Sequence, residues 1–474
     1  MKSSLRFAML PILLLGLAHL CSGQNQAPVR GPKAVLGNAS PGFARVAPIA
    51  VNSVQPAQAS STNITLDFPA NAVSSHAVFA TRSGNAPSGA AAAGTSRINR
   101  STATNGGHAF DGQHPNLPTI DGLDSLATFG GGFINQAGPD LGTFFPFTMI
   151  GNHPLAGGTT VIPAQITTVN LRLLNADGSL NVAVPFEFRD RLEDSPNFAQ
   201  TNYRSGRHIQ YADAVHRAQF FHAMGDDWHT VLHPQFVNDV TINVPQFVNI
   251  QFADGTVLTG VQSYFLARTS EGKPVVFMLD LLFNFFYTNQ VIDDINAGNF
   301  TTDGLSMTMF PNTFLFSIDE QANVVSCCVL GFHTYFNDPI AIPQPRWVTL
   351  FASWISPGTF GPGFEDVAGL SHEVAESFAD PFVDNTTSSW QFPGVDPKAQ
   401  ICQSNLEEGD PLETLATETV SLPLREGHEV FTYHPQIIPL LQWFEMGAKS
   451  NAVDGAFSFP DETALPHSAL PCPL

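Results

Sequence analysis

One segment of the sequence combines residue types that metal-dependent hydrolases use, at the spacing of an α-helix. His372 and Glu376 are four residues apart, so on a helix they project from one face about one turn apart. Glu373 lies next to them, rotated by about 100°. This is the layout of the zinc-hydrolase helix, whose common form has His at the first and fifth positions and Glu at the second. Here Glu376 takes the fifth position, and a carboxylate is also an accepted zinc ligand.

The chemistry predicted for this segment is metal-assisted hydrolysis. His372 and Glu376 would hold zinc, which would polarise a carbonyl group and stabilise an oxyanion. Glu373 would be the catalytic general base that takes a proton from water. A carboxylate in place of the second histidine adds negative charge and weakens the Lewis acidity of the metal. The sequence therefore predicts a peptidase-type zinc hydrolase that acts on a peptide or protein substrate.

A further metal ligand must come from another segment of the chain. Asp410 and Glu407 are the leading candidates, because this acidic pair follows the helix after a loop long enough to fold back. Asp380 lies about two turns beyond His372 and roughly 80° round the helix, so it is a candidate to bind the metal or to orient a ligand. His333 is a candidate to line the site or to orient a ligand, with a packed strand histidine as the alternative.

Two other interpretations of the acidic helix are open. Oxygen ligands drawn from Glu376, Asp380, Glu407 and Asp410 would suit calcium better than zinc, in a secreted protein whose site is structural and not catalytic. The helix could also present a solvated acidic face with an ordinary histidine. A glycosidase that uses Glu373 and Glu376 as its acid and base is disfavoured, because two residues three apart on a helix lie close together.

Three segments resemble the plant Exordium (phosphate-induced protein) family and its bacterial secreted relatives. Ser371–Pro381 is similar to the family pattern His-Glu-x-Ala-Glu followed by Asn-Pro or Asp-Pro. Cys328–Phe336 resembles its Cys-Gly-Phe-His segment, which places His333 on the family histidine. Residues 407–410 resemble its Glu-x-(Gly/Ala)-Asp segment, with Trp390 in between as in the family. The resemblance covers roughly residues 325–415.

The resemblance has departures that limit what it implies. Pro411 stands where the family has a cysteine after the acidic segment, and Cys402 is a candidate to replace that cysteine. The glycine-rich run of the plant members is missing. What the resemblance implies is a secreted protein with a zincin-like helix, and in plants a growth-linked, cell-wall-associated one. It does not imply proteolysis.

The helix that carries these residues is predicted over residues 364–379. Val367, Leu370, Val374 and Phe378 recur at intervals of three and four and form an apolar stripe suited to burial. A second amphipathic helix is expected over residues 435–446. Both belong to a mixed zincin-like region, residues 346–446, that packs on a β-rich domain. A C-terminal tail, residues 447–474, follows.

The β-rich domain is predicted over residues 131–345, so the fold class is α+β. Segments rich in Val, Ile, Thr and Phe, separated by turn residues, predict its strands. These are Thr159–Ile166, Thr168–Leu174, Val184–Phe188, Phe247–Phe252, Val275–Leu282 and Thr313–Ile318. A helical pattern over residues 210–224 interrupts them. The histidines in and near it, His216, His222, His229 and His233, do not fall on one helical face, which favours structural or surface roles.

The first residues predict the compartment. Lys2 and Arg6 precede an apolar run over residues 7–20, and small residues follow up to Gly23, as in a secretory signal peptide. Residues 1–23 are therefore expected to be removed after Gly23, and the protein to be secreted. Residues 24–130, rich in Ala, Ser, Asn, Gly, Pro and Thr, read as a low-complexity, largely disordered leader arm. No later run is long and apolar enough to predict a membrane span.

The overall charge narrows the class of partner. The chain has 474 residues, with 41 acidic against 20 basic side chains and a formal net charge of −21. Binding of nucleic acid through its phosphates needs patches of Lys and Arg, so this class of function is disfavoured. A cation is the partner that such a chain tolerates best.

Four cysteines remain after the signal peptide, namely Cys327, Cys328, Cys402 and Cys472. Secretion permits disulfides, and four cysteines allow three pairings. Because adjacent cysteines seldom bridge each other, we expect Cys327 and Cys328 to pair with Cys402 and Cys472. Structural staples are favoured over a metal–thiolate site.

Overall fold

The computed structural model describes residues 78–79, 125–202, 208–251, 257–318, 322–337, 345–360, 364–391, 402–412, 420–423, 429–447 and 465. The predicted signal peptide, nearly all of the predicted leader and the C-terminal tail apart from residues 447 and 465 lie outside these residues. Cys472 therefore lies outside them too.

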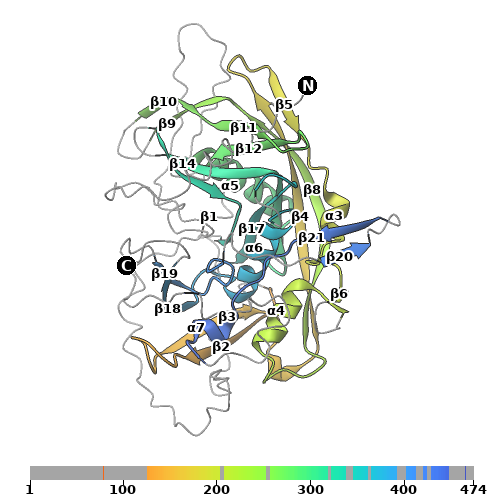
Figure 1. The fold of residues 1–474 in the computed structure, drawn as a ribbon, viewed down its shortest axis with the longest axis vertical. Coiled ribbons are helices and arrows are strands. Elements are labelled where there is room, and N and C mark those ends of the chain that lie inside the picture. The colour runs from red at the N-terminus through yellow and green to blue at the C-terminus, as the bar shows by residue number, and fades with distance from the viewer. Residues whose placement is uncertain are drawn as a thin grey trace, which may run out of the picture.

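The described chain is a mixed α+β, strand-rich fold built on a seven-stranded sheet. The strand order is β1-β16-β17-β13-β4-β5, and β8 pairs with the other edge of β4. The strands are β1 (Val78–Phe79), β16 (Gly331–Asn337), β17 (Arg346–Trp354), β13 (Leu305–Pro311), β4 (Thr159–Leu174), β5 (Leu180–Val184) and β8 (His229–Val244). The long strands β4 and β8 run side by side along the molecule (Figure 1).

The sheet is mixed. β13 is parallel to both β17 and β4, and β4 is parallel to β8, whereas β16 is antiparallel to β17. Parallel neighbouring strands need a long connection between them. The chain between the parallel strands β4 and β8 passes first through β5 and then through α4 (Tyr211–Gln219).

Helices pack on both faces of this sheet. Because successive strand residues point to opposite faces, β17 sends Leu350 and Trp354 to the face covered by α6 (Ala368–Ala379). Phe351 points to the other face, which is covered by α5 (Asp280–Ala297). The two faces thus bury separate apolar cores, with α6 packed on β16 and β17.

A second sheet and several short elements complete the described chain. The four-stranded sheet has the order β11-β12-β14-β15, from Tyr264–Arg268, Pro274–Leu279, Thr313–Ile318 and Val324–Val329. Two-stranded pairs are β2 (Thr128–Ile134) with β3 (Phe144–Ile150), β6 (Thr201–Asn202) with β7 (His208–Ile209), β9 (Phe247–Gln251) with β10 (Val257–Gln262), β18 (Thr386–Gln391) with β19 (Cys402–Asn405), and β20 (Val420–Pro423) with β21 (Val430–Tyr433). The remaining helices are α3 (Arg189–Glu193), α7 (Leu441–Phe444) and the 3₁₀ turn η2 (Pro154–Ala156).

Several predicted boundaries differ from those of the structure. β17 begins at Arg346 but pairs with β13 and β16, so the boundary predicted at 345/346 cuts through one sheet. The folded part also begins before residue 131, since β2 starts at Thr128 and Phe129 is buried. Gly131 lies within β2, not in a loop, because its missing side chain leaves room for the ring of Phe147.

The disulfide prediction needs correction. The structure bonds Cys327 to its neighbour Cys328, not to a distant cysteine. The expectation that this pair would bridge to Cys402 and Cys472 rested on the rarity of bonds between adjacent cysteines, and this chain has one of these rare bonds.

None of the helices in the described part of the chain is long and apolar enough to cross a membrane.

Candidate metal centre

Helix α6 carries three of the predicted site residues into the interior. Every residue from Ala368 to Ala379 is buried, because the sheet covers the apolar stripe of the helix and other segments cover its remaining faces. His372 is 7% exposed, whereas Glu373 and Glu376 are 1% and 0% exposed. Ionisable groups in such a place need partners that compensate for the lost water.

The orientation of His372 is set by Gln436. The side-chain nitrogen Nε2 of Gln436 donates to the carbonyl oxygen of Gly409 at 2.9 Å. The amide oxygen Oε1 of Gln436 therefore faces the Nδ1 of His372, 2.7 Å away, and accepts a hydrogen bond from it. When Nδ1 carries the proton of a neutral imidazole, Nε2 keeps its lone pair, which is the arrangement that metal-binding histidines show.

The Nε2 of His372 faces two carboxylates. It lies 3.2 Å from Oε2 of Glu376 and 3.4 Å from Oδ1 of Asp410. Donor atoms of these three buried residues all lie within 4.8 Å of one another, a group that could hold a metal ion. The structure thus brings Asp410 to the helix, as the sequence predicted.

The other oxygen of Glu376 holds the acidic loop in place. Its Oε1 accepts hydrogen bonds from the backbone N–H groups of Gly409 and Asp410, both at 3.1 Å. A side chain at residue 409 would collide with the ring of His372, since a Cβ there would lie 2.7 Å from its Cγ. Glycine is therefore required for the loop to approach this closely.

His333 enters the same region from strand β16. Phe332 and Phe336 lie on the same strand and pack on the α5 side of the sheet. Because successive side chains of a strand point to opposite faces, His333 points to the α6 side. Its Nε2 donates to the carbonyl oxygen of Asp380 at 3.1 Å, which leaves the lone pair on Nδ1 when the ring is neutral.

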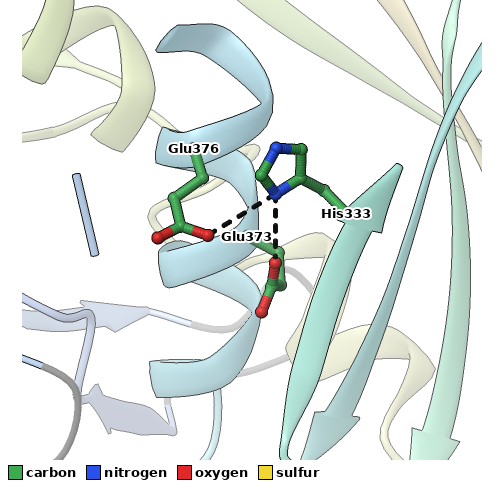
Figure 2. A group of neighbouring side chains, drawn as sticks. All are labelled: His333, Glu373 and Glu376. Carbon is green, nitrogen blue, oxygen red and sulfur yellow. Dashed lines mark ion pairs between the residues drawn. The ribbon is translucent and has the colours of Figure 1, made fainter. Parts of the chain in front are cut away.

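Nδ1 of His333 points between two carboxylates of α6 (Figure 2). It lies 3.6 Å from Oε2 of Glu373 and 3.5 Å from Oε2 of Glu376. His333, Glu373 and Glu376 form a second group whose donor atoms lie within 4.8 Å of one another. The prediction that His333 lines the site is consistent with this position.

Glu407 and Asp380 take positions behind His333. Oε2 of Glu407 lies 3.6 Å from Nε2 of His333, which is not the nitrogen that faces Glu373 and Glu376. Glu407 belongs to neither three-residue group. Asp380 ends α6, and its carboxylate accepts hydrogen bonds from the backbone of Asp384 and Asn385, both at 2.9 Å. It therefore orients His333 through its carbonyl oxygen and not through its carboxylate.

The surroundings shift the pKa values of both histidines upward. Burial alone would lower the pKa of His333, but Glu407, Glu373 and Glu376 outweigh it and hold the pKa well above its ordinary value. Burial also acts to lower the pKa of His372, and there Glu376, Glu373 and Asp410 outweigh it. Each nitrogen that faces the carboxylates is therefore a place where positive charge is strongly favoured.

The pKa values of the carboxylates in this cluster shift in different directions. Burial raises the pKa of Glu373 to about 7, despite the opposing effect of His372. Burial acts in the same direction on Glu376, but His372 and His333 outweigh it and lower the pKa to about 2. Burial and the charge of Asp384 raise the pKa of Asp380 to about 8, and burial raises that of Glu407 well above its usual range. Glu376 is thus the firmly ionised centre of the cluster.

Among the residues that the structure describes, no lysine or arginine forms an ion pair with this cluster. Within the described part of the chain, the ion pairs of Glu373, Glu376 and Glu407 all involve His333 or His372. Side-chain atoms Oε2 of Glu373 and Glu376 have no hydrogen-bond partner there. Buried carboxylates without basic side chains require protons or a metal cation.

Sequence reasoning missed several residues that build the centre. Gln436 orients His372, and Gly409 makes room for it. Gly331 does the same for Glu373, since a Cβ at residue 331 would lie 2.6 Å from its Oε1. Glu408 is fully buried beside the predicted acids. A glycine inside the predicted acidic motif was the one available signal, because glycine permits close approach.

A third acidic group lies at the start of α6 and is explained by local contacts. Asp366 accepts hydrogen bonds from the backbone N–H of His434 at 2.9 Å and from that of Val367 at 2.6 Å. Its second oxygen lies 2.7 Å from Nδ1 of His434. These contacts tie the residue-434 segment to the helix.

Comparison of the chain with protein-family models, with curated proteins and with solved structures finds no match. The resemblance to the Exordium family therefore remains a prediction from three segments.

Proposed function

We propose that this chain is a secreted metal-dependent hydrolase of the peptidase type, with a zincin-like helix. His372, Glu376 and Asp410 bind a zinc ion, and Glu373 is the general base. Secretion rests on the signal-peptide pattern of residues 1–23, and the Exordium resemblance supports both the compartment and the helix. The observation that carries the proposal is the convergence of three buried donor atoms. Oε2 of Glu376 and Oδ1 of Asp410 lie 3.2 and 3.4 Å from Nε2 of His372.

The donor types favour zinc over calcium. An imidazole nitrogen with two carboxylate oxygens is a normal zinc set, whereas calcium takes six to eight oxygen ligands. The hydrogen bond to Gln436 presents the nitrogen of His372 in the required form. Bound zinc would polarise a substrate carbonyl and lower the pKa of a water molecule.

The position of Glu373 suits a proton acceptor beside the ion. Its Oε1 lies 3.7 Å from Nε2 of His372, so the carboxylate borders the three-residue group without belonging to it. Gly331 keeps this carboxylate in place by leaving the space that it occupies. From there Glu373 takes the proton of the attacking water and returns it to the leaving group.

The metal content of the purified secreted protein tests the ligands. We expect about one firmly held zinc per chain, which is lost in His372→Ala. The matched control is His229→Ala, because His229 also pairs with a buried carboxylate, that of Asp213 at 2.7 Å, but lies in another part of the fold. Loss of zinc in both variants, or calcium in the wild type, would contradict the assignment.

Cleavage of a peptide mixture tests the base. Glu373→Gln should keep the firmly held zinc and lose activity by roughly a hundredfold or more, the usual contribution of a general base. Asp280→Asn is the control, since Asp280 is also a buried carboxylate but belongs to α5 on the other side of the sheet.

Burial favours a second candidate, a structural metal centre without catalysis. Glu376 and Asp410 are both fully buried, and His372 is only 7% exposed, as is usual for structural sites with closed coordination. In that case the protein binds zinc, and removing the zinc lowers its stability, but neither the wild type nor Glu373→Gln cleaves peptides.

A further inference from the structure

We propose a second cation position, formed by His333, Glu373 and Glu376, whose occupation inhibits the hydrolase. This inference rests on the proposed function, because the inhibition follows from the role of Glu373 as the base. The ligand is a divalent transition-metal ion such as zinc, bound at higher concentration than the first.

The buried nitrogen of His333 carries the argument for binding. His333 is fully buried, and its Nε2–H is already used by the carbonyl oxygen of Asp380. Its Nδ1 has no hydrogen-bond partner among the described residues, yet it is aimed at two carboxylate oxygens 3.5 and 3.6 Å away. A neutral ring presents a lone pair to those oxygens, which is repulsive unless a proton or a metal cation lies between them, and a metal ion competes with the proton for this position.

The second position is distinct from the first and shares one residue with it. Oε2 of Glu376 lies 3.2 Å from Nε2 of His372 and 3.5 Å from Nδ1 of His333. Asp410 completes one group and Glu373 the other. Paired metal ions in enzymes are typically about 3.5–4 Å apart, so bridging carboxylates are suited to hold two of them.

Inhibition follows from what the second ion binds. Oε2 of Glu373 is the oxygen that faces His333, and it has no hydrogen-bond partner in the described part of the chain. A carboxylate that binds a cation is a weaker base, so it no longer accepts the proton of water. Excess metal therefore removes the proton acceptor while the first ion stays bound.

Equilibrium dialysis against zinc chloride, with metal analysis, tests the second position. The wild type should bind about two zinc ions at excess zinc. His333→Asn and Glu373→Gln should each bind about one, because both leave the His372 group intact. His229→Asn, at a histidine that pairs with Asp213 in another part of the fold, should still bind as the wild type does. Two ions in both His333→Asn and Glu373→Gln would overturn the proposal, and the second variant decides if the first does not fold.

Peptide cleavage at increasing zinc tests the inhibition. The first equivalent should activate the wild type, and excess zinc should lower the rate by roughly a hundredfold, the contribution of the base. His333→Asn should keep the activation and lose the inhibition, whereas His229→Asn should show both. Activity that rises with the second equivalent would overturn the inhibitory role. A chain that loses one ion in both variants but cleaves no peptide would overturn the inhibition and the proposed function, and leave the second position supported.

Discussion

Gln436 determines which nitrogen of His372 faces the carboxylates. Its side chain is anchored by donation to Gly409, so its oxygen can only accept from Nδ1 of His372. We predict that Gln436→Met, which keeps the size but removes the acceptor, weakens zinc binding by about 10–100-fold, the usual effect of losing such a partner. Competition with a chromogenic chelator measures the affinity.

The control for this prediction is Gln262→Met. Gln262 is a partly buried glutamine whose amide donates to the carbonyl oxygen of Tyr264, on the β10–β11 connection. Its substitution should leave zinc affinity unchanged. An equal loss of affinity in both variants would mean that Gln436 acts through stability and not through His372.

His216 should make the fold sensitive to acid. Its ring is 1% exposed, parallel to Trp228 and edge-on to Phe378, and burial lowers its pKa from 6.5 to about 3. Between these two values the unfolded chain takes up a proton and the folded chain does not. Stability from this residue is therefore complete above pH 6.5 and falls as the pH drops toward 3, by up to roughly 4 kcal/mol.

Replacing the ring tests this directly. His216→Phe keeps an aromatic ring and cannot be protonated, so its free energy of unfolding should fall less than that of the wild type between pH 7 and pH 4. Urea titrations at both values measure the difference. A wild-type-to-variant difference that is the same at pH 7 and pH 4 would show that His216 is not the titrating group.

Strand β16 and helix α6 approach each other so closely that Gly331 sets the position of Glu373, the proposed base. A Cβ at residue 331 would lie 2.6 Å from Oε1 of Glu373 and 2.9 Å from the carbonyl oxygen of Phe351. Gly331→Ala should therefore displace Glu373 and lower peptide cleavage by an order of magnitude or more, because misplaced catalytic groups lose that much.

Gly369→Ala is the matched control for this change. Gly369 lies on α6, and a Cβ there would meet its nearest neighbour, the carbonyl oxygen of Leu330, at an ordinary 3.5 Å. Alanine favours a helix by about 1 kcal/mol over glycine, so this variant should be at least as stable as the wild type. Similar losses of activity in both variants would count against the special role of Gly331.

Helix α6 and the shared face of His372 and Glu376 could be predicted from the sequence because both depend on local spacing. A stripe at intervals of three and four marked the buried face, and His372 and Glu376 shared another face. Asp410 was among the candidates because its acidic pair follows the helix after a loop long enough to fold back. The partners of these residues were not, because the contacts of Gln436 and Gly331 depend on how distant segments pack.

Helix α5 shows where the local patterns were misleading. The sequence predicted a strand over residues 275–282, but β12 ends at Leu279 and the helix runs from Asp280 to Ala297. Aromatic and β-branched residues (Phe, Tyr, Ile, Val and Thr) together fill eight of its 18 positions, and they favour strands in isolation. Burial against the sheet outweighs that preference, with Phe283 and Tyr287 in the core.

The cluster buries several carboxylates in the interior of the molecule. Their burial lowers the free energy of unfolding, and a bound cation would offset this loss. We predict that zinc at about 100 times its dissociation constant raises the free energy of unfolding by about 2.7 kcal/mol, and that a chelator reverses this. Thermal unfolding with and without zinc measures the shift. His372→Ala should show a much smaller shift, and His229→Ala should behave as the wild type.

The side chains that build the centre come from four distant parts of the chain, and this has a consequence for the order of events during folding. In an unfolded chain, α6 offers only His372 and Glu376 close together, a pair that would hold zinc weakly. Asp410 and Gln436 join only when the acidic loop and the segment before α7 have docked, and His333 only when β16 has paired with β17. Firm retention of a bound ion would therefore require the finished tertiary structure, so the uptake of zinc during refolding would report the last steps of folding.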